Sequence, residues 1–467
     1  MKQTDLSINK GKIQVCLILP RMKYATGDLP LGIAYIASLL RKSEICDLDL
    51  IDMTFDKGFG RVTNLLKNKS YDIVGFSVMS SMHIDALKIA SIIKRANPNS
   101  VIVFGGPHPT TMPEDTINCP QVDAICIGEA ELTFMEIVAK KGKFDRINGV
   151  WYKWGKKIIK NKPREYIKSL DRLPYPALDM LPINKYFKYW FQMDSVAHNL
   201  KGISIMASRG CYYNCSNCQP TVSKLFGKKV RKRQPKKIVE ELLYWKNKYK
   251  ITAFMFLDDT FVFDKKWVKN ICYEIEKADL KLIWACNSRV DLIDKKLFKI
   301  MKKAGLRKVF LGIECASQRI LNDIYNKGLK KISVSHEINK LKELGLKIQG
   351  HFMIGAPTES INDIRDTINL AKNLAIDEAA FHITTPLPGT HLYHKTKQLI
   401  GKEIGFFDYY RTSVYNSKAV LSSQKLNILK KTALLSFYLS KRRILSTVFS
   451  FFTITGFMKN LLKLKRF

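Results

Sequence analysis

Residues 203–218 read ISIMASRGCYYNCSNC, a short apolar run followed at once by three cysteines. The spacing of Cys211, Cys215 and Cys218 is C-x3-C-x2-C, so one short loop can wrap a single metal centre. Three thiolates suit a [4Fe–4S] cluster that keeps one iron open, whereas a closed zinc site needs a fourth ligand. The next cysteine is Cys272, beyond zinc-ribbon spacing. The stretch therefore predicts an iron–sulfur loop directly after a β-strand, with a chance grouping of thiols as the alternative.

This run opens a series of strand–helix units. Helical patterns such as Lys236–Lys248 and Ser333–Leu344 separate the apolar runs. The predicted strands are Ile203–Ser208, Ala253–Asp258, Leu282–Cys286, Lys308–Glu314, Gln349–Gly355 and Ala380–Thr385. Six such units predict a partial TIM-like (β/α)6 barrel, whose site would lie at the carboxyl ends of the strands.

Residues 12–140 alternate in the same way. The amphipathic stretches are Leu31–Lys42, Ile84–Arg95 and Glu131–Lys140. The predicted strands are Lys12–Pro20, Leu48–Met53, Tyr71–Ser80, Ser100–His108 and Ala124–Gly128. Nearly continuous apolar strands between helices predict an α/β fold with a doubly wound, mostly parallel sheet of the flavodoxin or Rossmann type. Ligands in such sheets bind beyond the carboxyl ends of the strands, where Gly75, Gly105, Gly106 and Gly128 lie. Tight turns and packing are the alternative explanation for these glycines.

The sequence pattern changes over residues 146–200, where a small hairpin pattern precedes the proline-containing segment LDRLPYPALDMLP. We therefore expect a first domain over 1–145, a linker with a hairpin over 146–200, a barrel over 201–408 and a basic helical region over 409–467.

The charge is large but uneven. The 467 residues hold 78 Lys+Arg against 41 Asp+Glu, a net charge of +37. Residues 1–150 contribute +2, residues 151–408 contribute +23 and residues 409–467 contribute +12. Lys outnumbers Arg by 60 to 18, whereas recognition of phosphates and bases favours Arg. We attribute the charge mainly to compositional bias and solvated faces, and we do not expect a nucleic-acid partner.

Further segments fall at the predicted strand ends, in order, after the cysteine loop. They are FLDDTF at 256–261, NSRVD at 287–291, GIE at 312–314, GHFMIG at 350–355 and TPLPGT at 385–390. Together with the cysteine loop, these segments resemble the radical S-adenosylmethionine (SAM) enzymes. The N-terminal half narrows the resemblance to the subgroup with a cobalamin-binding domain. The resemblance implies that Cys211, Cys215 and Cys218 hold a [4Fe–4S] cluster that cleaves SAM to a 5′-deoxyadenosyl radical.

The resemblance also implies SAM-binding residues. Asp258 and Asp259 would meet the amino group, Arg289 the carboxylate, Glu314 the ribose, and Gly350 and Gly355 the adenine. Each has a structural alternative: a helix cap or ion pair for the two aspartates, pairing of Arg289 with Asp291 or Glu314, and turn geometry for the glycines. Asn217 stands where the superfamily usually has an aromatic residue, and Tyr213 could supply an aromatic contact instead.

The segments YDIVGFSVMS at 71–80, GGPHPT at 105–110 and IGEAE at 127–131 resemble the cobalamin domain of this subgroup, and the resemblance implies a cobalamin site. Its candidate residues are Gly75, Ser77, Gly105, Gly106, His108, Gly128 and Glu129. The subgroup's usual D-x-H-x-x-G motif is missing, because residues 21–27 read RMKYATG. We therefore expect cobalamin to bind without a histidine ligand, and we assign His108 to the loop rather than to the cobalt. A domain that has lost cobalamin is the alternative.

The other seven cysteines, outside the loop, lie mostly in apolar runs and are expected to be small buried hydrophobic residues. The tail after residue 409 has no acidic residue, and residues 444–458 have no charge. We expect a helical cap on the barrel; contact with an anionic membrane surface is the alternative. No secretory signal and no apolar run of spanning length are visible, so we expect a cytoplasmic protein, with a peripheral place at the inner membrane surface if the tail binds lipid.

The resemblance implies a methyltransferase that acts on an unactivated carbon of a small molecule: a lipid, a tetrapyrrole or a natural-product scaffold. Its reductant would be a one-electron donor such as flavodoxin or ferredoxin. A cyclase or rearrangement enzyme of the same subgroup is the nearest alternative. An RNA- or protein-modifying methylthiotransferase is a more distant one, because it would need a second cysteine-bound cluster near the N-terminus.

Overall fold

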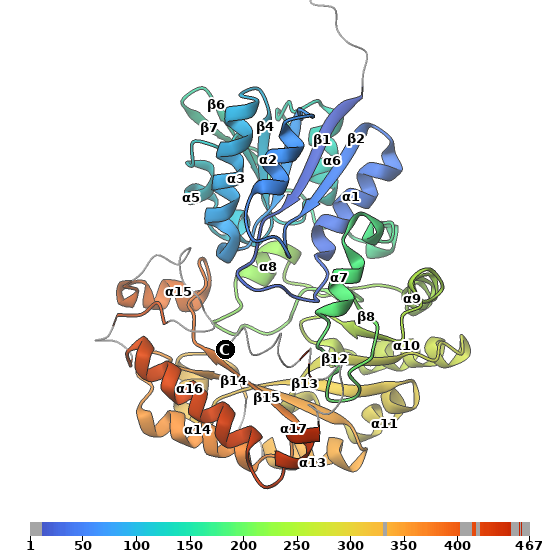
Figure 1. The fold of residues 1–467 in the computed structure, drawn as a ribbon, viewed down its shortest axis with the longest axis vertical. Coiled ribbons are helices and arrows are strands. Elements are labelled where there is room, and N and C mark those ends of the chain that lie inside the picture. The colour runs from blue at the N-terminus through green and yellow to red at the C-terminus, as the bar shows by residue number, and fades with distance from the viewer. Residues whose placement is uncertain are drawn as a thin grey trace, which may run out of the picture. The chain divides into compact units, whose positions relative to one another are not determined.

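The computed structural model describes residues 12–329, 334–401, 413–416 and 421–449, together with Phe457 and Lys459. The chain divides into two compact units (Figure 1). The first comprises residues 1–21, 32–165 and 173–181, and the second comprises residues 22–31, 166–172 and 182–467. The described part of the C-terminal region thus belongs to the same unit as the barrel.

The first unit is built on a seven-stranded sheet in the order β2-β1-β3-β4-β5-β6-β7. Its strands are β1 (Ile13–Leu19), β2 (Cys46–Asp52), β3 (Ile73–Ser77), β4 (Val101–Gly105), β5 (Ala124–Cys126), β6 (Val150–Trp154) and β7 (Lys157–Lys160). Its helices are α1 (Leu31–Ser43), α2 (Gly60–Leu66), α3 (His83–Ala96), α4 (Pro107–Thr111), α5 (Pro113–Ile117) and α6 (Glu131–Ala139). The first five strands are parallel in the flavodoxin order 2-1-3-4-5, which confirms the predicted doubly wound sheet.

The hairpin predicted within residues 146–200 continues this sheet. Strand β6 pairs antiparallel with β5, and β7 pairs antiparallel with β6. Val150 on β6 and Ile147 just before it are fully buried. The residues that read as the start of a linker therefore complete the core of the first unit.

The second unit contains a six-stranded, all-parallel sheet in the order β15-β14-β13-β12-β11-β8, curled into a half-barrel. Its strands are β8 (Gly202–Ile205), β11 (Ala253–Phe256), β12 (Ile283–Arg289), β13 (Leu306–Glu314), β14 (Lys347–Ile354) and β15 (Glu378–Ile383). A separate pair is formed by β9 (Ser208–Arg209) and β10 (Arg231–Lys232). Each of the six predicted strands is present, which confirms the partial barrel.

Helices follow the strands of the half-barrel. They are α7 (Ile183–Lys188), α8 (Thr221–Phe226), α9 (Pro235–Tyr249), α10 (Lys265–Lys277), α11 (Lys295–Lys303), α12 (Gln318–Asp323), α13 (Val334–Glu343), α14 (Ile361–Asn373) and α15 (His391–Thr396). Local chemistry sets several starts: Asp264 and Asp294 cap α10 and α11 by accepting backbone N–H bonds. Trp190 and Met193, from the segment before β8, pack against Met255 and Phe310 of the sheet. The segment after the predicted hairpin thus fills part of the half-barrel.

The predicted helical C-terminal region is present as α16 (Ser423–Tyr438) and α17 (Ile444–Phe449). Helix α16 packs on β15 and α14 (Figure 1), and the Tyr438 hydroxyl donates to the Ala379 carbonyl over 3.3 Å. Most of the tail beyond residue 449 lies outside the described residues. Within the described ranges, no helix has both the length and the apolar character needed to span a bilayer.

Candidate active site

The three cysteines occupy a loop that leaves the half-barrel after β9. Backbone hydrogen bonds hold this loop to two other segments: the Ser216 N–H donates to the Tyr325 carbonyl over 2.8 Å, and the Leu392 N–H donates to the Ser216 carbonyl over 2.8 Å. The cysteine loop is thus tied to the segments that carry Tyr325 and Leu392. Cys211 and Cys215 are partly exposed and Cys218 is exposed, so the thiols are accessible.

Burial raises the pKa of the Cys211 thiol and raises the pKa of the Cys218 thiol to about 12, while donors beside the loop favour the thiolates that a cluster would bind. The Tyr213 backbone N–H donates to the Cys211 sulfur, and the Arg289 guanidinium lies 3.7 Å from the Cys215 sulfur. Donors and positive charge stabilise thiolate sulfur. In the described part of the chain, no three His, Cys, Asp or Glu side chains converge on one ion. The donor set still fits an iron–sulfur cluster, because its thiolates bind separate irons.

Arg289, at the end of β12, joins four groups next to the loop. Its guanidinium donates to both carboxylate oxygens of Asp291 over 2.9 and 3.0 Å and to the Lys327 carbonyl over 2.9 Å. It also lies over the Tyr213 ring, 3.6 Å from the centroid. Of the expected partners, Asp291 is therefore present and Glu314 is not, and Tyr213 contacts this arginine.

Glu314, at the end of β13, pairs instead with Lys327. The two charges are 2.5 Å apart and both side chains are buried. The strand bulges at this point, and Glu314 takes a left-handed φ of +68°. A Cβ on Gly312 would lie 2.8 Å from the Lys327 amine, so a larger residue there would displace the pair. Lys327 lies in the loop after α12, outside the motifs quoted from the sequence, and the sequence analysis missed it.

Asp258 and Asp259, after β11, are placed differently. Asp258 is buried and accepts from the Ala207 N–H over 3.1 Å and from the Ser208 hydroxyl, so it anchors the backbone that leads into the cysteine loop. Asp259 is exposed and makes no hydrogen bond or ion pair to the described residues. The protein packed around Asp259 and the neighbouring Asp258 carboxylate raise its pKa to about 6. Of the two, Asp259 has the free carboxylate.

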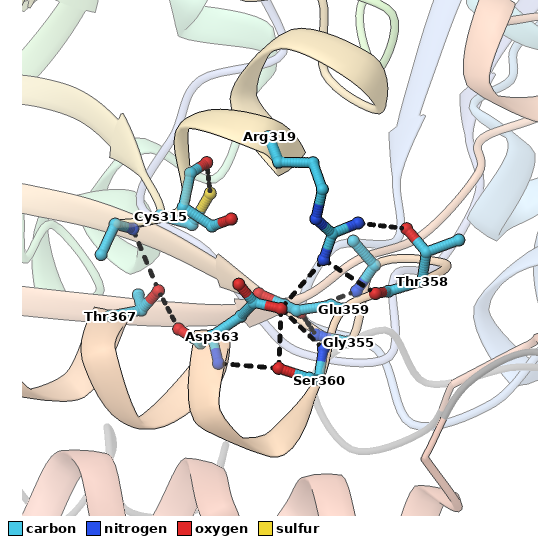
Figure 2. Close-up of polar contacts among 11 residues, drawn as sticks. Cys315, Arg319, Gly355, Thr358, Glu359, Ser360, Asp363 and Thr367 are labelled. Carbon is cyan, nitrogen blue, oxygen red and sulfur yellow. Dashed lines mark hydrogen bonds and ion pairs between the residues drawn. The ribbon is translucent and has the colours of Figure 1, made fainter. Parts of the chain in front are cut away.

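The end of β14 is organised by a residue that the sequence analysis also missed. Figure 2 shows Glu359 next to Gly355: its carboxylate accepts from the Gly355 N–H over 2.5 Å and from the Ala356 N–H over 2.9 Å. Gly355 has φ +82°, and Leu426 of α16 would lie 2.8 Å from an added Cβ. At Gly350 a Cβ would press on Phe352, Ile376 and Ile313, so packing accounts for that glycine.

A second polar group braces the same turn. Arg319 of α12 donates to the Thr358 hydroxyl, the Thr358 carbonyl and Asp363, each over 3.0 Å (Figure 2). Ser360 and Asp363 form a reciprocal capping box at the start of α14. The turn that carries Gly355 is therefore held by Glu359, by Arg319 and by the capping box of α14.

Two histidines face each other across β14 and β15. The His351 Nδ1 and His382 Nε2 atoms are 3.3 Å apart, and the rings are nearly parallel. Burial, with His382, Lys308 and Lys327 nearby, lowers the pKa of His351 to about 3. The pair is therefore neutral. His351 lies opposite Gly312 where β14 pairs with β13, and the next residue, Phe352, lies opposite Glu314.

The N-terminal candidates gather at the carboxyl ends of β3, β4 and β5. The Val78 N–H donates to the Gly105 carbonyl over 2.8 Å, the His108 N–H to the Val78 carbonyl over 3.1 Å, and the Gly128 N–H to the Thr110 hydroxyl over 3.0 Å. Ser77 ends β3, and Glu129 follows Gly128 and is buried. Gly106 has φ +101°, which favours glycine, whereas Gly75 is a packing position under the Phe134 ring.

His108 is buried in this group. Its Nδ1 lies 3.1 Å from the Ser80 hydroxyl, and its ring lies 4.2 Å from that of His83. Its Nε2 has no partner among the described residues. Burial, with His83 beside it, lowers the pKa of His108 to about 3, so the imidazole is neutral. The contacts hold His108 within the loop, and the absence of a histidine ligand to cobalt stays a prediction.

The remaining cysteines are mostly buried. Cys16, Cys46 and Cys126 are buried in strands of the first unit, and Cys119 is partly exposed. Cys272, Cys286 and Cys315 are buried in the second unit.

Comparison with known proteins gives separate family matches to the N-terminal part of the chain and to the half-barrel. The B12 binding domain family matches residues 25–138, and the Radical SAM superfamily matches residues 205–371. An uncharacterized methyltransferase of Pyrococcus horikoshii is 34% identical over 449 residues, covering 94% of this chain and 95% of the relative. The anaerobic magnesium-protoporphyrin IX monomethyl ester cyclase of Rubrivivax gelatinosus is 30% identical, covering 81% of this chain and 68% of the relative.

A solved structure agrees in fold. The radical SAM methyltransferase TsrM of Kitasatospora setae, with cobalamin and a [4Fe–4S] cluster bound, superposes with a TM-score of 0.66 at 15% identity. The match covers 83% of this chain and 75% of TsrM. Fold, family matches and the full-length relative agree, and the chain therefore belongs to the radical SAM enzymes that carry a B12-binding domain.

Proposed function

We propose that this enzyme is a cobalamin-dependent methyltransferase that acts on an unactivated carbon of a lipid, tetrapyrrole or natural-product substrate. The observation that carries the proposal is the accessible three-cysteine loop beside Arg289 and the Glu314–Lys327 pair at the carboxyl ends of the half-barrel. The full-length similarity to a methyltransferase-named relative supports the reaction class.

We assign the cluster-binding and SAM-binding roles to the following residues. Cys211, Cys215 and Cys218 hold a [4Fe–4S] cluster. The free carboxylate of Asp259 binds the amino group of SAM, and the carboxylate of Glu314 accepts from its ribose hydroxyls. When bound, the cluster and SAM supply a carbon-centred radical, and cobalamin supplies the methyl group.

Charge is balanced around this site by residues of the chain. Arg289 and Lys327 place two cations beside the cysteine loop, where they pair with Asp291 and Glu314, and Arg289 would balance the carboxylate of SAM. Asp258 fixes the start of the cysteine loop, and Glu359 fixes the Gly355 backbone that adenine would approach. These positioning residues keep the loop and the turn in one geometry.

For the N-terminal unit, we propose that the loops after β3, β4 and β5 bind cobalamin without a histidine ligand. Ser77, Gly105, Gly106, Gly128 and Glu129 line these strand ends. The electron donor would be a flavodoxin or ferredoxin.

Cyclisation is the second candidate, because one relative at 30% identity is named as a cyclase. A methylthiotransferase is less well supported, because Cys16, Cys46 and Cys126 are buried in strands rather than grouped in a loop.

The test is anaerobic purification and reconstitution with iron, sulfide and cobalamin, followed by visible spectra and assay of 5′-deoxyadenosine from SAM. Replacing Cys215 by Ala should abolish the cluster absorbance and lower 5′-deoxyadenosine formation at least about 100-fold. Cys272→Ala, a buried cysteine in α10, is the matched control and should retain both. A Cys215→Ala protein that still forms cluster and product would overturn the assignment.

Failure to retain cobalamin would remove the methyl donor from the proposal. Transfer of a deuterated methyl group from SAM to a compound in a cell extract distinguishes methylation from cyclisation.

A further inference from the structure

Helix α16 has two apolar faces. One packs on the half-barrel through Leu426, Ala433 and Phe437, which are fully buried. The opposite face presents Ile428, Leu435 and Leu439, which are 58%, 60% and 56% exposed. Residues seven and four apart share one side of a helix, so these three form a continuous outward stripe.

Further exposed apolar residues follow the end of α16: Ile444, Leu445 and Val448 of α17. Of the fifteen large hydrophobic residues that are exposed in the described ranges, six lie between residues 428 and 448. We call these six residues the outer face. Lys459 is buried and donates to the Trp190 carbonyl over 3.0 Å, so Phe457 is not counted with them. Isolated exposed leucines are ordinary, but such a concentration marks an interaction surface.

The exposure does not come from a loosely attached helix. Arg443, just after α16, is buried and donates to the carbonyls of Lys372, Leu374 and Ile376, while its guanidinium lies 3.9 Å from the Phe437 ring centroid. At the other end, Leu426 packs against Gly355. The inner side of α16 is therefore fixed, and its orientation forces the outer face away from the half-barrel.

Charge indicates what the outer face meets. Lys425, Lys431, Lys441 and Arg442 are exposed around the stripe. Residues 409–467 hold 12 Lys+Arg and no acidic residue. The neighbouring α14 exposes both Arg365 and Asp366, which cancel. Two copies of such a surface would repel each other, whereas an anionic partner is attracted.

We propose that the outer face docks on an anionic membrane surface, with α16 and α17 lying in the headgroup layer. Aliphatic side chains along one side of a helix, with lysines at the margins, are the chemistry of interfacial helices. Lysine stems can extend along the apolar stripe while their amines reach lipid phosphates. This inference goes beyond the proposed reaction and stands on the charge and exposure of α16 and α17 alone.

The test is co-sedimentation of the full-length protein with vesicles of phosphatidylcholine alone and with vesicles containing phosphatidylglycerol. We expect binding to the anionic vesicles at least 10-fold tighter than to the neutral ones, and weakening as salt rises above about 0.3 M. Leu435→Glu with Leu439→Glu should lower binding about 100-fold. Lys425→Gln with Lys431→Gln should lower it about 20-fold.

Tyr273→Glu is the matched control, because Tyr273 on α10 is 63% exposed and lies outside the outer face. It should bind anionic vesicles like the unaltered protein, and circular dichroism should show that all variants are folded. Equal binding by the Leu435/Leu439 variant, or no vesicle binding by the unaltered protein, would overturn the proposal. So would a change from dimer to monomer in the leucine variant without vesicle binding, because the outer face would then join two copies of the chain.

Discussion

At the residue scale, the site depends on charged groups that the fold buries or pairs. Glu359 is the clearest case, because it is buried and yet accepts two backbone N–H bonds through one oxygen while its other oxygen has no partner among the described residues (Figure 2). Burial raises the pKa of Glu359 from 4.5 to about 7. A carboxyl group with a raised native pKa releases its proton less readily in the folded state than in the unfolded chain.

This residue gives a pH prediction. Its contribution to stability should fall as the pH rises from about 4.5 to about 7, by about 3 kcal/mol in total. Glu359→Gln keeps an acceptor for the Gly355 and Ala356 N–H groups and removes the charge. We therefore expect the glutamine variant to match the unaltered protein at about pH 5 and to be more stable by about 2–3 kcal/mol at about pH 8.

Urea denaturation of both proteins at the two pH values measures this difference. Glu359→Ala also removes the titrating group but leaves two N–H groups without an acceptor, so it should be about 2 kcal/mol less stable than Glu359→Gln at both pH values. A glutamine variant whose relative stability does not change with pH would show that Glu359 has the same pKa in the folded protein and in the unfolded chain.

Residues were also the scale at which sequence reasoning reached its limit. The cysteine loop, Glu314 and Asp259 could be named from local motifs. Lys327 could not, because its partner Glu314 is reached only when the loop after α12 folds back over the end of β13. Asp258 was expected to meet a ligand, but its partners Ala207 and Ser208 follow β8, which lies beside β11 only in the folded sheet.

At the element scale, short apolar runs between amphipathic helices were enough to predict every strand of the two parallel sheets, because buried parallel strands are apolar on both sides. The hairpin β6–β7 was also predicted. Its membership of the first sheet was not, because antiparallel pairing of β6 with β5 depends on a tertiary contact with no signal in the local pattern.

The attachment of α16 gives a prediction at this scale. Arg443 joins the end of α16 to the carbonyls that follow α14, so Arg443→Leu should leave three carbonyls without this donor. We expect faster amide hydrogen exchange across residues 423–443 and a loss of about 3 kcal/mol in local stability. Arg442→Leu is the control, since Arg442 is exposed and donates only to the Asn373 carbonyl among the described residues. Equal exchange in the two variants would mean that packing alone holds α16.

At the scale of the whole molecule, the boundary after residue 145 is open to a direct test. A fragment that ends there lacks β6 and β7, and with them the buried Ile147, Val150 and Tyr152. We expect a 12–145 fragment to be less stable than a 12–181 fragment by at least about 4 kcal/mol, from the apolar area lost. Thermal unfolding of the two fragments makes the comparison, and equal midpoints would place the boundary where the sequence pattern put it.

The division of the chain has a consequence for ancestry and engineering. The polypeptide passes from one unit to the other at 21/22, 31/32, 165/166, 172/173 and 181/182. Gly27 lies in the segment 22–31, which belongs to the second unit. It fits so closely against Tyr189 and Trp190 that a Cβ would clash with their backbones. A recombination event that exchanged the N-terminal unit in one piece would therefore replace residues 22–31 as well. We expect chimeras between relatives to function only when these ten residues are exchanged together with the barrel.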